Sequence, residues 1–541
     1  MSTCSRKFEA DVVIVGSGAA GAAIAWRLSY SGMRIVCLEQ GGFINPREFP
    51  CTQSDWEAKM LKEFSFNPNI RASQADYPVN DDESPIKIAN FNGVGGGTIL
   101  YSAHFPRFQP SDFRVKTLDG IADDWPLDYF MLEKYYKLNE KIVGVSGLSG
   151  DPAYPHDSSR RLPPLPLGKS GQVLAKGFNS LGWHWWPSDT AILTEAYGGR
   201  SKCINLGTCN SGCAHGAKGS ADITYWPMAI RRGVELKTKC RVHAIKVNGQ
   251  SKATGVVYFD DLGNEHEISA AVIVLACNGI GTPRLLLNSK CKSCPDGVAN
   301  SSGLVGRNLM LHPYTSIQGL FDEPLDGHVG PLKSIRSHEF YQTDFSRGFI
   351  RGYTLEATRG MPPVRTATVG ARHNRVPWGA THHHAYRKMF GKMTGFVAIC
   401  EDLPNQHNRV TLDSELRDSS GIPAPRIEYK ISSNSLNMME HSISKASEVL
   451  LAAGAHDILV ESPLVDAGWH HLGTARMGNN NKTSVVNSWG QSHDVKNLFI
   501  ADGSIFVTGS GVNPTNTIQA LALYIGDEIC KRADQLFKKS R

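Results

Sequence analysis

The side chains best suited to proton chemistry in this 541-residue chain lie near its end. Two adjacent histidines, His470 and His471, stand in the run HHLGTARMG, and Asn513 stands in NPTNT. The unperturbed pKa of a histidine lies near neutrality, so either ring could take up a proton. An asparagine cannot take up a proton, but its amide can bond a substrate oxygen. Which of these groups acts depends on the elements that position them.

A glycine-rich turn near the N-terminus predicts a nucleotide site. The run ADVVIV, residues 10–15, is typical of a buried parallel strand, and GSGAAG follows it directly. A helical stretch and a second apolar run at 33–38 come next, closed by Glu39. Strand, glycine turn, helix, strand and acid in this order are typical of a dinucleotide-binding unit. The alternative is a βαβ unit that binds no nucleotide.

Each glycine of that turn has a physical role. Gly16 permits a tight turn, Gly18 lets a pyrophosphate approach the backbone, and Gly21 lets the helix pack closely on the strand. The N-terminus of the helix then faces the phosphate charge. Glu39 stands where a carboxylate can hold ribose hydroxyls.

Other pieces of a nucleotide domain are spread along the whole chain. Residues 92–98, NGVGGGT, form a second glycine cluster whose backbone amides could cradle a phosphate or a planar group. Apolar runs at 271–276 and 498–501 predict two more strands, the second running into Asp502 and Gly503. We therefore expect one discontinuous domain with other material inserted.

Composition excludes several classes of partner. The net charge is only +6 and no run of Lys and Arg concentrates it, which argues against nucleic acid. No apolar window of about 18 residues exists, so no membrane span is expected. The apolar stretch 12–25 contains glycines and follows acidic residues, unlike a secretory signal. Twelve irregularly spaced cysteines do not indicate a disulfide framework.

Taken together, the motifs resemble the glucose–methanol–choline (GMC) family of FAD oxidoreductases. The resemblance covers nearly the whole chain, through GSGAAG with Glu39, NGVGGGT, GLVGRNLMLHP, HHLGTARMG and ADGS with NPTNT, in that order. DWP at 124–126, YY at 135–136 and NRVT at 408–411 look like the branch of bacterial glucose, gluconate and fructose dehydrogenases, with pyranose and C-glycoside oxidases nearby.

The fold that this resemblance implies is α/β (α+β overall): a doubly wound FAD-binding domain with an inserted antiparallel-sheet substrate domain. We assign residues 1–313 to a discontinuous FAD-binding domain, 314–462 to the substrate-binding domain, and 463–541 to the return into the FAD-binding domain with the catalytic residues. Runs at 395–399 and 426–430 alternate like strands. Residues 323–390 read as a long loop or lid, and their three adjacent histidines would not converge on one metal ion.

The family also implies site residues. Removing a hydride from an alcohol requires a base for the hydroxyl proton and an acceptor, which flavin N5 supplies. His470 matches the family position that carries the base, His471 should point away, and Asn513 is the partner. Asn513 also looks like an N-cap for the apolar helix that follows it. Further FAD contacts are expected at Ala19, Ala20, Gly95, Gly96, Gly97, Thr98, Val242, Asp502, Gly503, Pro514 and Thr515.

The expected substrate is a small-molecule sugar, polyol or glycoside. A non-sugar primary alcohol and a non-catalytic flavin-binding protein are the alternatives. A disulfide or quinone reductase would need a second complete dinucleotide motif, and none is visible.

Three cysteines have the spacing C-x5-C-x3-C: Cys203, Cys209 and Cys213. A similar spacing in the heterotrimeric dehydrogenases of the family holds a three-iron (3Fe–4S) cluster, which passes electrons to a partner such as a cytochrome. The resemblance implies such a cluster and partner here; the alternative is three reduced thiols retained for packing. We expect a cytoplasmic protein, or a periplasmic one only if a partner subunit carries it.

The cofactor should be bound without a covalent link. Some family members tether FAD through a histidine just after the glycine segment, and that position here is Leu100, with His104 out of register. Acid or heat should therefore release FAD from the purified yellow protein into the supernatant, as its absorbance will report. Flavin that stays on the precipitated chain would contradict this expectation.

Overall fold

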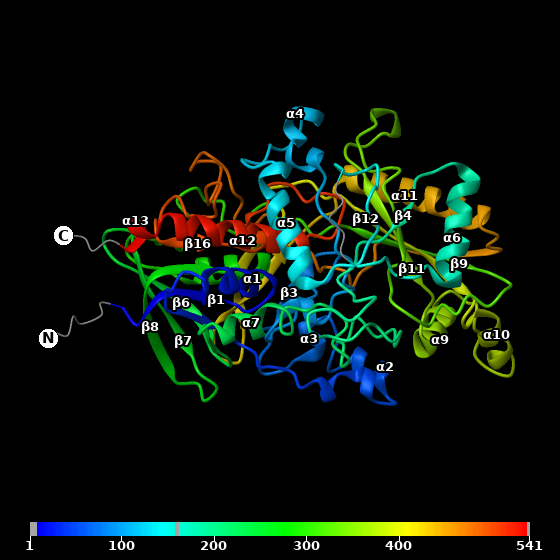
Figure 1. The fold of residues 1–541 in the computed structure, drawn as a ribbon, viewed down its shortest axis with the longest axis horizontal. Helices are drawn as coiled ribbons and strands as arrows, with labels where there is room; N and C mark the ends of the chain where they lie inside the picture. The colour runs from blue at the N-terminus through cyan, green and yellow to red at the C-terminus, as the bar shows by residue number, and fades with distance from the viewer. Residues whose placement is uncertain (1–7, 157–161, 538–541) are drawn as a thin grey trace.

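Three β-sheets organise the chain in the computed structural model, which describes residues 8–156 and 162–537 (Figure 1). The first sheet lies at the left of Figure 1 and the second at the right, with helices over both. The doubly wound unit and the antiparallel sheet that the sequence predicts are both present.

The first sheet contains a parallel core in the strand order β5-β2-β1-β8-β16. These strands are β1 (Ala10–Val15), β2 (Ile35–Leu38), β5 (Glu235–Lys237), β8 (Glu265–Leu275) and β16 (Leu498–Ile500). Strands β1 and β2 are apolar almost throughout because both faces of this part of the sheet are covered.

Strand β8 takes part in two kinds of pairing. Its first half is charged, exposed and antiparallel to β7 (Ala253–Phe259), which in turn pairs with β6 (Arg241–Val247). Its second half, AAVIVL, is largely buried and parallel to β1. The antiparallel strands β6 and β7 are therefore continuous with the parallel core through β8.

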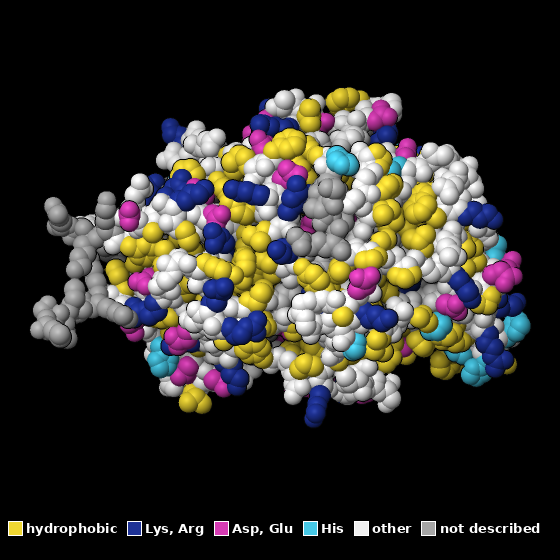
Figure 2. All heavy atoms as spheres, viewed as in Figure 1, with side chains coloured by type: hydrophobic (Ala, Val, Ile, Leu, Met, Phe, Trp, Pro, Cys, Tyr) yellow, Lys and Arg dark blue, Asp and Glu magenta, His cyan; other side chains and the backbone are white. Residues whose placement is uncertain are grey.

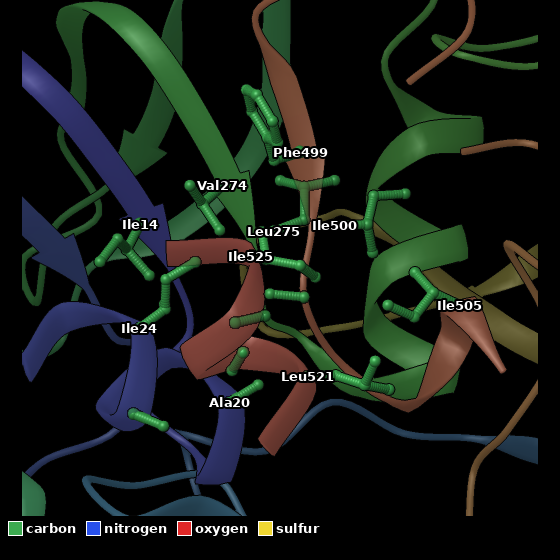
Figure 3. Close-up of a cluster of buried hydrophobic side chains, with 14 of the residues drawn as sticks. Ile14, Ala20, Ile24, Val274, Leu275, Phe499, Ile500, Ile505, Leu521 and Ile525 are labelled. Carbon is green, nitrogen blue, oxygen red and sulfur yellow. The ribbon is translucent and has the colours of Figure 1, made fainter. Parts of the chain in front are cut away.

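The largest hydrophobic core lies between this sheet and its helices (Figure 3). Ile24 of α1 (Ala19–Leu28) and Ile525 of α12 (Thr515–Lys531) meet Ile14, Leu275 and Ile500 from three strands. Alanines and glycines dominate α1, so α12 can pack closely against it. The neighbouring helices are α5 (Tyr129–Val143) and α7 (Tyr225–Arg231).

The second sheet is antiparallel, in the order β15-β9-β12-β11-β10-β4. Its strands are β4 (Trp186–Pro187), β9 (Tyr314–Leu320), β10 (Ile335–Ser337), β11 (Tyr353–Arg359), β12 (Met393–Cys400) and β15 (Asp457–Glu461). Helix α11 (Ser433–Ala452) covers one face together with α6 (Gly168–Leu181), which comes from the part of the chain assigned to the first domain. The domain boundaries stay a prediction.

Side chains alternate strictly across this sheet. Ile317 and Leu355 enter the hydrophobic core beneath α6 and α11. Their neighbours Ser316, Gln318 and Glu356 point to the opposite face, where they line a cavity. One face thus stabilises the fold and the other is free for chemistry.

The prediction of a long loop at 323–390 is wrong in its centre. Strands β10 and β11 lie there, followed by helices α9 (Pro363–Arg372) and α10 (His382–Met389). Residues 353–358, YTLEAT, alternate between apolar and polar side chains, which is a local strand signal that the loop prediction does not use. The three adjacent histidines open α10 at the end of the molecule where histidines and basic side chains gather (Figure 2).

A third, small sheet joins β13 (Arg409–Arg417), β14 (Pro423–Glu428) and β3 (Asn80–Glu83). The strand expected at 426–430 thus belongs to this sheet and not to the second. The remaining helices are α2 (Trp56–Leu61), α3 (Pro68–Arg71), α4 (Val115–Asp119), α8 (Asn278–Asn288) and α13 (Ala533–Phe537). Within the described ranges, no helix is both long and apolar enough to cross a bilayer.

Two glycine turns from distant parts of the chain lie against each other. A Cβ on Gly96 would come within 2.8 Å of the Gly18 Cα, and Gly96 has a φ of +52°. Any side chain at 96 would therefore push the two turns apart.

Gly96→Ala should lower the free energy of unfolding by about 1–3 kcal/mol, the usual cost of overpacking a tight site. Thermal or urea denaturation will measure the change. Gly249→Ala is the control because a Cβ there would meet nothing within 4 Å. Equal stability of the two variants would mean that the turns are not in contact.

Candidate active site

A cavity of about 880 Å³ lies between the first sheet and the polar face of the second. Its size falls in the range of small-molecule pockets. The turn at Gly16 and Gly18 lines one end, and His470 and Asn513 are also in its wall. The motifs singled out at both ends of the sequence therefore meet at one site.

Most predicted contacts of the nucleotide lie in the wall of this cavity. They are Gly16, Gly18, Ala19, Ala20, Glu39, Gly96, Gly97, Thr98, Val242, Asp502, Gly503, Pro514 and Thr515. Gly21 and Gly95 lie behind it, where Gly21 packs under Gly16 and a Cβ on Gly95 would meet Ile99 and Asp222. These two glycines shape the backbone instead of lining the site.

Glu39 holds the glycine turn in place. Its carboxylate accepts hydrogen bonds from the Ser17 backbone N–H at 2.9 Å, from the Ser17 hydroxyl at 2.8 Å and from the Gly41 N–H at 2.9 Å. Burial raises the pKa of Glu39, and these donors act in the opposite direction. A carboxylate has further lone pairs, so ribose hydroxyls remain possible partners.

Two helix N-termini open on the cavity. Helix α1 begins after Gly18 and α12 after Pro514, and neither has a side-chain cap. The free N–H groups of a first turn favour anions such as phosphate. The cavity wall therefore suits a long dinucleotide, whose pyrophosphate the N-terminus of α1 would hold.

His470 lies in a chain of hydrogen bonds that fixes its tautomer. His312 Nε2 lies 3.1 Å from the Gly509 carbonyl oxygen, and His312 Nδ1 lies 2.8 Å from His470 Nδ1. A carbonyl can only accept, so His312 Nε2 carries the hydrogen. Burial lowers the pKa of His312 to about 4, which leaves its Nδ1 as an acceptor.

It follows that His470 donates from Nδ1 and keeps an unprotonated Nε2. Burial, and then the neighbouring His312, hold the pKa of His470 well below its ordinary value of 6.5. The Tyr314 hydroxyl lies beside the ring, 3.3 Å from Nδ1 and 3.4 Å from Nε2, and both residues line the cavity. A neutral ring with a free lone pair at the cavity is what a general base requires.

His471 is held differently. Its Nε2 lies 2.8 Å from the backbone oxygen of Gly468, three residues back, and must donate to it. Burial lowers the pKa of His471 to about 4. Because Nε2 donates in this way, the His471 ring stabilises the local backbone.

Asn513 does not cap helix α12, contrary to the expectation from sequence. The helix begins at Thr515 with Pro514 at the cap position. The Asn513 side chain turns instead towards His104, whose Nδ1 lies 2.6 Å from the Asn513 Oδ1. The side-chain oxygen that would accept a hydrogen bond as a helix cap is bonded instead to a buried histidine from a distant segment.

Five residues of the site were missed or given no role at the sequence level: His104, His312, Tyr314, Lys333 and Glu356. Only His312 gave a signal, because it is the second-to-last residue of the motif GLVGRNLMLHP. The other four stand in no motif, and tertiary pairing alone brings them together.

The three cysteines lie on one loop outside the cavity wall. Burial raises the pKa of Cys203 and of Cys209, while the guanidinium of Arg359 acts in the opposite direction on both. Lys218 Nζ ties the loop to the second glycine turn, donating to the backbone oxygens of Cys209 and Ile99 at 2.6 Å each. The loop thus sits directly behind that turn.

No three His, Cys, Asp or Glu side chains converge on a single metal position in the part of the chain that the structure describes. That geometry is a requirement for a mononuclear site. In a three-iron cluster each thiolate ligates its own iron, so convergence on one position is a requirement only for sites of a single metal ion.

Family models match two large parts of the chain. Residues 165–314 and 404–522 match the N-terminal and C-terminal models described as GMC oxidoreductase. Residues 14–73 match a model described as an NAD(P)-binding Rossmann-like domain.

Similar proteins extend these matches over nearly the full length. The 2-methyl-1,2-propanediol dehydrogenase of Mycolicibacterium austroafricanum is 41% identical, covering 97% of this chain and 96% of its own. The fructose dehydrogenase large subunit of Gluconobacter japonicus is 27% identical, covering 97% and 98%. A formate oxidase structure from Aspergillus oryzae RIB40 aligns with a TM-score of 0.66 at 16% identity, covering 98% and 100%, and shows a shared fold.

Proposed function

The chain belongs to the glucose–methanol–choline family of FAD oxidoreductases, and on that premise we propose that it oxidises a hydroxyl group of a polyol, sugar or glycoside. The observation that carries the proposal is the neutral His470 ring, held by His312 with Nε2 unprotonated at the cavity. A ring in this state can take the hydroxyl proton as the hydride leaves the same carbon.

FAD, when bound, supplies the acceptor for the hydride. The groups that take the proton and bond the substrate oxygen belong to the chain itself. His470 Nε2 receives the proton, and Asn513 in the cavity wall can bond the substrate oxygen. The uncapped N-terminus of α12 adds a positive dipole end, which stabilises negative charge next to it.

The polar face of the second sheet supports a hydroxyl-rich substrate. Ser316 and Gln318 of β9 and Thr358 of β11 line the cavity, on either side of β12. The Gln318 amide donates to the Thr358 hydroxyl at 2.7 Å, and within the described chain its Oε1 has no hydrogen-bond partner. A buried acceptor without a donor is costly, and a substrate hydroxyl would satisfy it. The named diol and fructose relatives point the same way.

The substrate class can be tested by anaerobic bleaching of the bound flavin with a panel of diols, sugars, glycosides and simple alcohols. We expect diols or sugars to reduce the flavin fastest. Preference for simple monohydric alcohols would replace this substrate class with the non-sugar alternative, and no reduction by any alcohol would leave a non-catalytic flavin-binding protein.

Two routes are open to electrons that leave the reduced flavin. They differ in whether the loop of Cys203, Cys209 and Cys213 holds an iron–sulfur cluster. We propose a 3Fe–4S cluster on Cys203, Cys209 and Cys213 that passes electrons to a partner protein. The spacing, the shared loop and its link to the second glycine turn through Lys218 support it. The alternative is reduced thiols, with electrons passing straight from flavin to oxygen or a small quinone.

The anaerobically purified protein should contain about three irons per flavin, by metal analysis, and absorb beyond the flavin bands. Cys209→Ser should lose the iron while keeping the flavin. The control is Cys400→Ser, because Cys400 is buried in the core under the second sheet, far from the loop in sequence. If the wild-type protein contained no iron, the cluster proposal would be wrong and the three cysteines would be reduced thiols retained for packing.

His470→Ala should slow flavin reduction by about a hundredfold or more, the scale of lost general-base catalysis, while FAD stays bound. His471→Ala is the matched control and should affect the chemical step much less. Since the pKa of His470 lies well below 6.5, the wild-type rate should not fall as the pH is lowered through 6.5. Stopped-flow absorbance measures both, and reversed effects of the two variants would assign the base to His471.

A further inference from the structure

A buried ion-pair cluster lies in the cavity wall next to Asn513, outside the His470–His312 chain. Glu356 Oε1 lies 2.6 Å from His104 Nδ1, and Glu356 Oε2 lies 2.8 Å from Lys333 Nζ. The side chains of His104, Glu356 and Lys333 are 0%, 1% and 7% exposed. Charges this deeply buried lower the free energy of unfolding unless they are paired, and here each of them has a partner of opposite charge.

The charge state of Glu356 follows from its neighbours. Burial by itself would raise its pKa, but His104 and Lys333 outweigh burial and hold the pKa well below 4.5. Glu356 is therefore ionised and can only accept hydrogen bonds. His104 Nδ1, at 2.6 Å from this carboxylate, must carry a hydrogen.

This hydrogen fixes the orientation of the Asn513 amide. The same Nδ1 lies 2.6 Å from Asn513 Oδ1, so Glu356 and Asn513 share its one hydrogen. An amide N–H turned towards this N–H would be repelled, so the group that Asn513 presents must be the acceptor oxygen, Oδ1. The Asn513 Nδ2, with two hydrogens, is then directed elsewhere. Among the described residues no acceptor is bonded to it, and Asn513 is only half-buried in the cavity wall.

We propose that His104, held by Glu356 and Lys333, is a positioning residue that turns the Asn513 amide so that its NH₂ group donates to the substrate oxygen. This inference rests on the proposed alcohol oxidation. As His470 takes the hydroxyl proton, negative charge develops on that oxygen, and a fixed donor stabilises it. Without His104 the amide is free to rotate and present its own oxygen, which would repel that charge.

Two variants of equal shape isolate this hydrogen bond. In His104→Asn, an amide N–H can stand near the former Nδ1 position and donate to Asn513; His104→Leu has the same size and no donor. Both lose the ring equally, so packing costs cancel in their comparison. We expect His104→Leu to slow the limiting rate of flavin reduction at least tenfold with little change in KM, and His104→Asn to restore most of that rate.

The gap between the two variants should disappear when Asn513 is replaced by alanine. This is the outcome that a purely structural role of His104 would not produce. His184→Leu is the matched control, since His184 also pairs with a buried carboxylate, Asp151 at 3.0 Å, but does not line the cavity. It should leave flavin reduction at the wild-type rate.

A binding measurement gives a second readout. Trifluoroethanol resists hydride removal, ionises readily, and can be titrated against the flavin absorbance of each variant. Its dissociation constant should rise about tenfold in His104→Leu and in Asn513→Ala, and no further in the double variant. Asn513→Asp, which keeps the shape but lacks the NH₂ group, should behave like Asn513→Ala and covers the case in which the His104 variants fail to fold.

Equal rates for His104→Leu and His104→Asn would overturn the proposal, as would a gap that survives in the Asn513→Ala background. An Asn513→Asp enzyme with the wild-type rate would do the same. Failure of the proposed function looks different: wild-type flavin would not be bleached by any alcohol, and the positioning role would fall with it.

Discussion

Charges buried where the two main sheets meet must find partners, and the architecture of the site depends on how they do so. Glu356 of β11 pairs with His104, Arg351 pairs with Asp112 at 2.5 Å, and Arg336 of β10 pairs with Asp189 at 3.0 Å. In the first two pairs one residue comes from the second sheet or its connections and the other from the segments around the first sheet. Asp189 lies just after β4, so the third pair lies within the second sheet. An unpaired charge there would be strongly destabilising. The two cavity walls are therefore held in one relative position, to within the tolerance of a hydrogen bond.

The same low-polarity environment sets the protonation state of the base. His470 and His312 are both neutral because burial penalises their charged forms, and one backbone carbonyl orders the hydrogens along the pair. Water would remove both effects, since it could donate or accept at either nitrogen. The chemistry proposed for the site thus relies on the packing around it as much as on the residues themselves.

Local patterns in the sequence were enough to find the parts of the fold whose signal is local. The apolar strands β1 and β8, the glycine turn and its order with Glu39 all follow from short-range rules. The family motifs predicted roles for His470 and Asn513, and both residues line the cavity. What could not be predicted depends on distant partners. The cap predicted at Asn513 is wrong because nothing local reveals His104. The sequence around residue 104 and the sequence around residue 513 give no sign that these two side chains form a hydrogen bond. Strand β11 is a different case, because its alternation YTLEAT is a local signal that the loop prediction does not use.

The close packing of α1 against α12 joins the two ends of the described chain. On the ribosome, the glycine turn at α1 emerges long before α12, Asn513 and Asp502 are made. Until then the apolar face of α1 has no partner and the cavity lacks a wall. A growing chain of this design cannot complete the cavity before α12 is made, and until then it exposes apolar surface that favours aggregation. Its yield in a cell should therefore depend on chaperone supply and on free flavin at the moment of release.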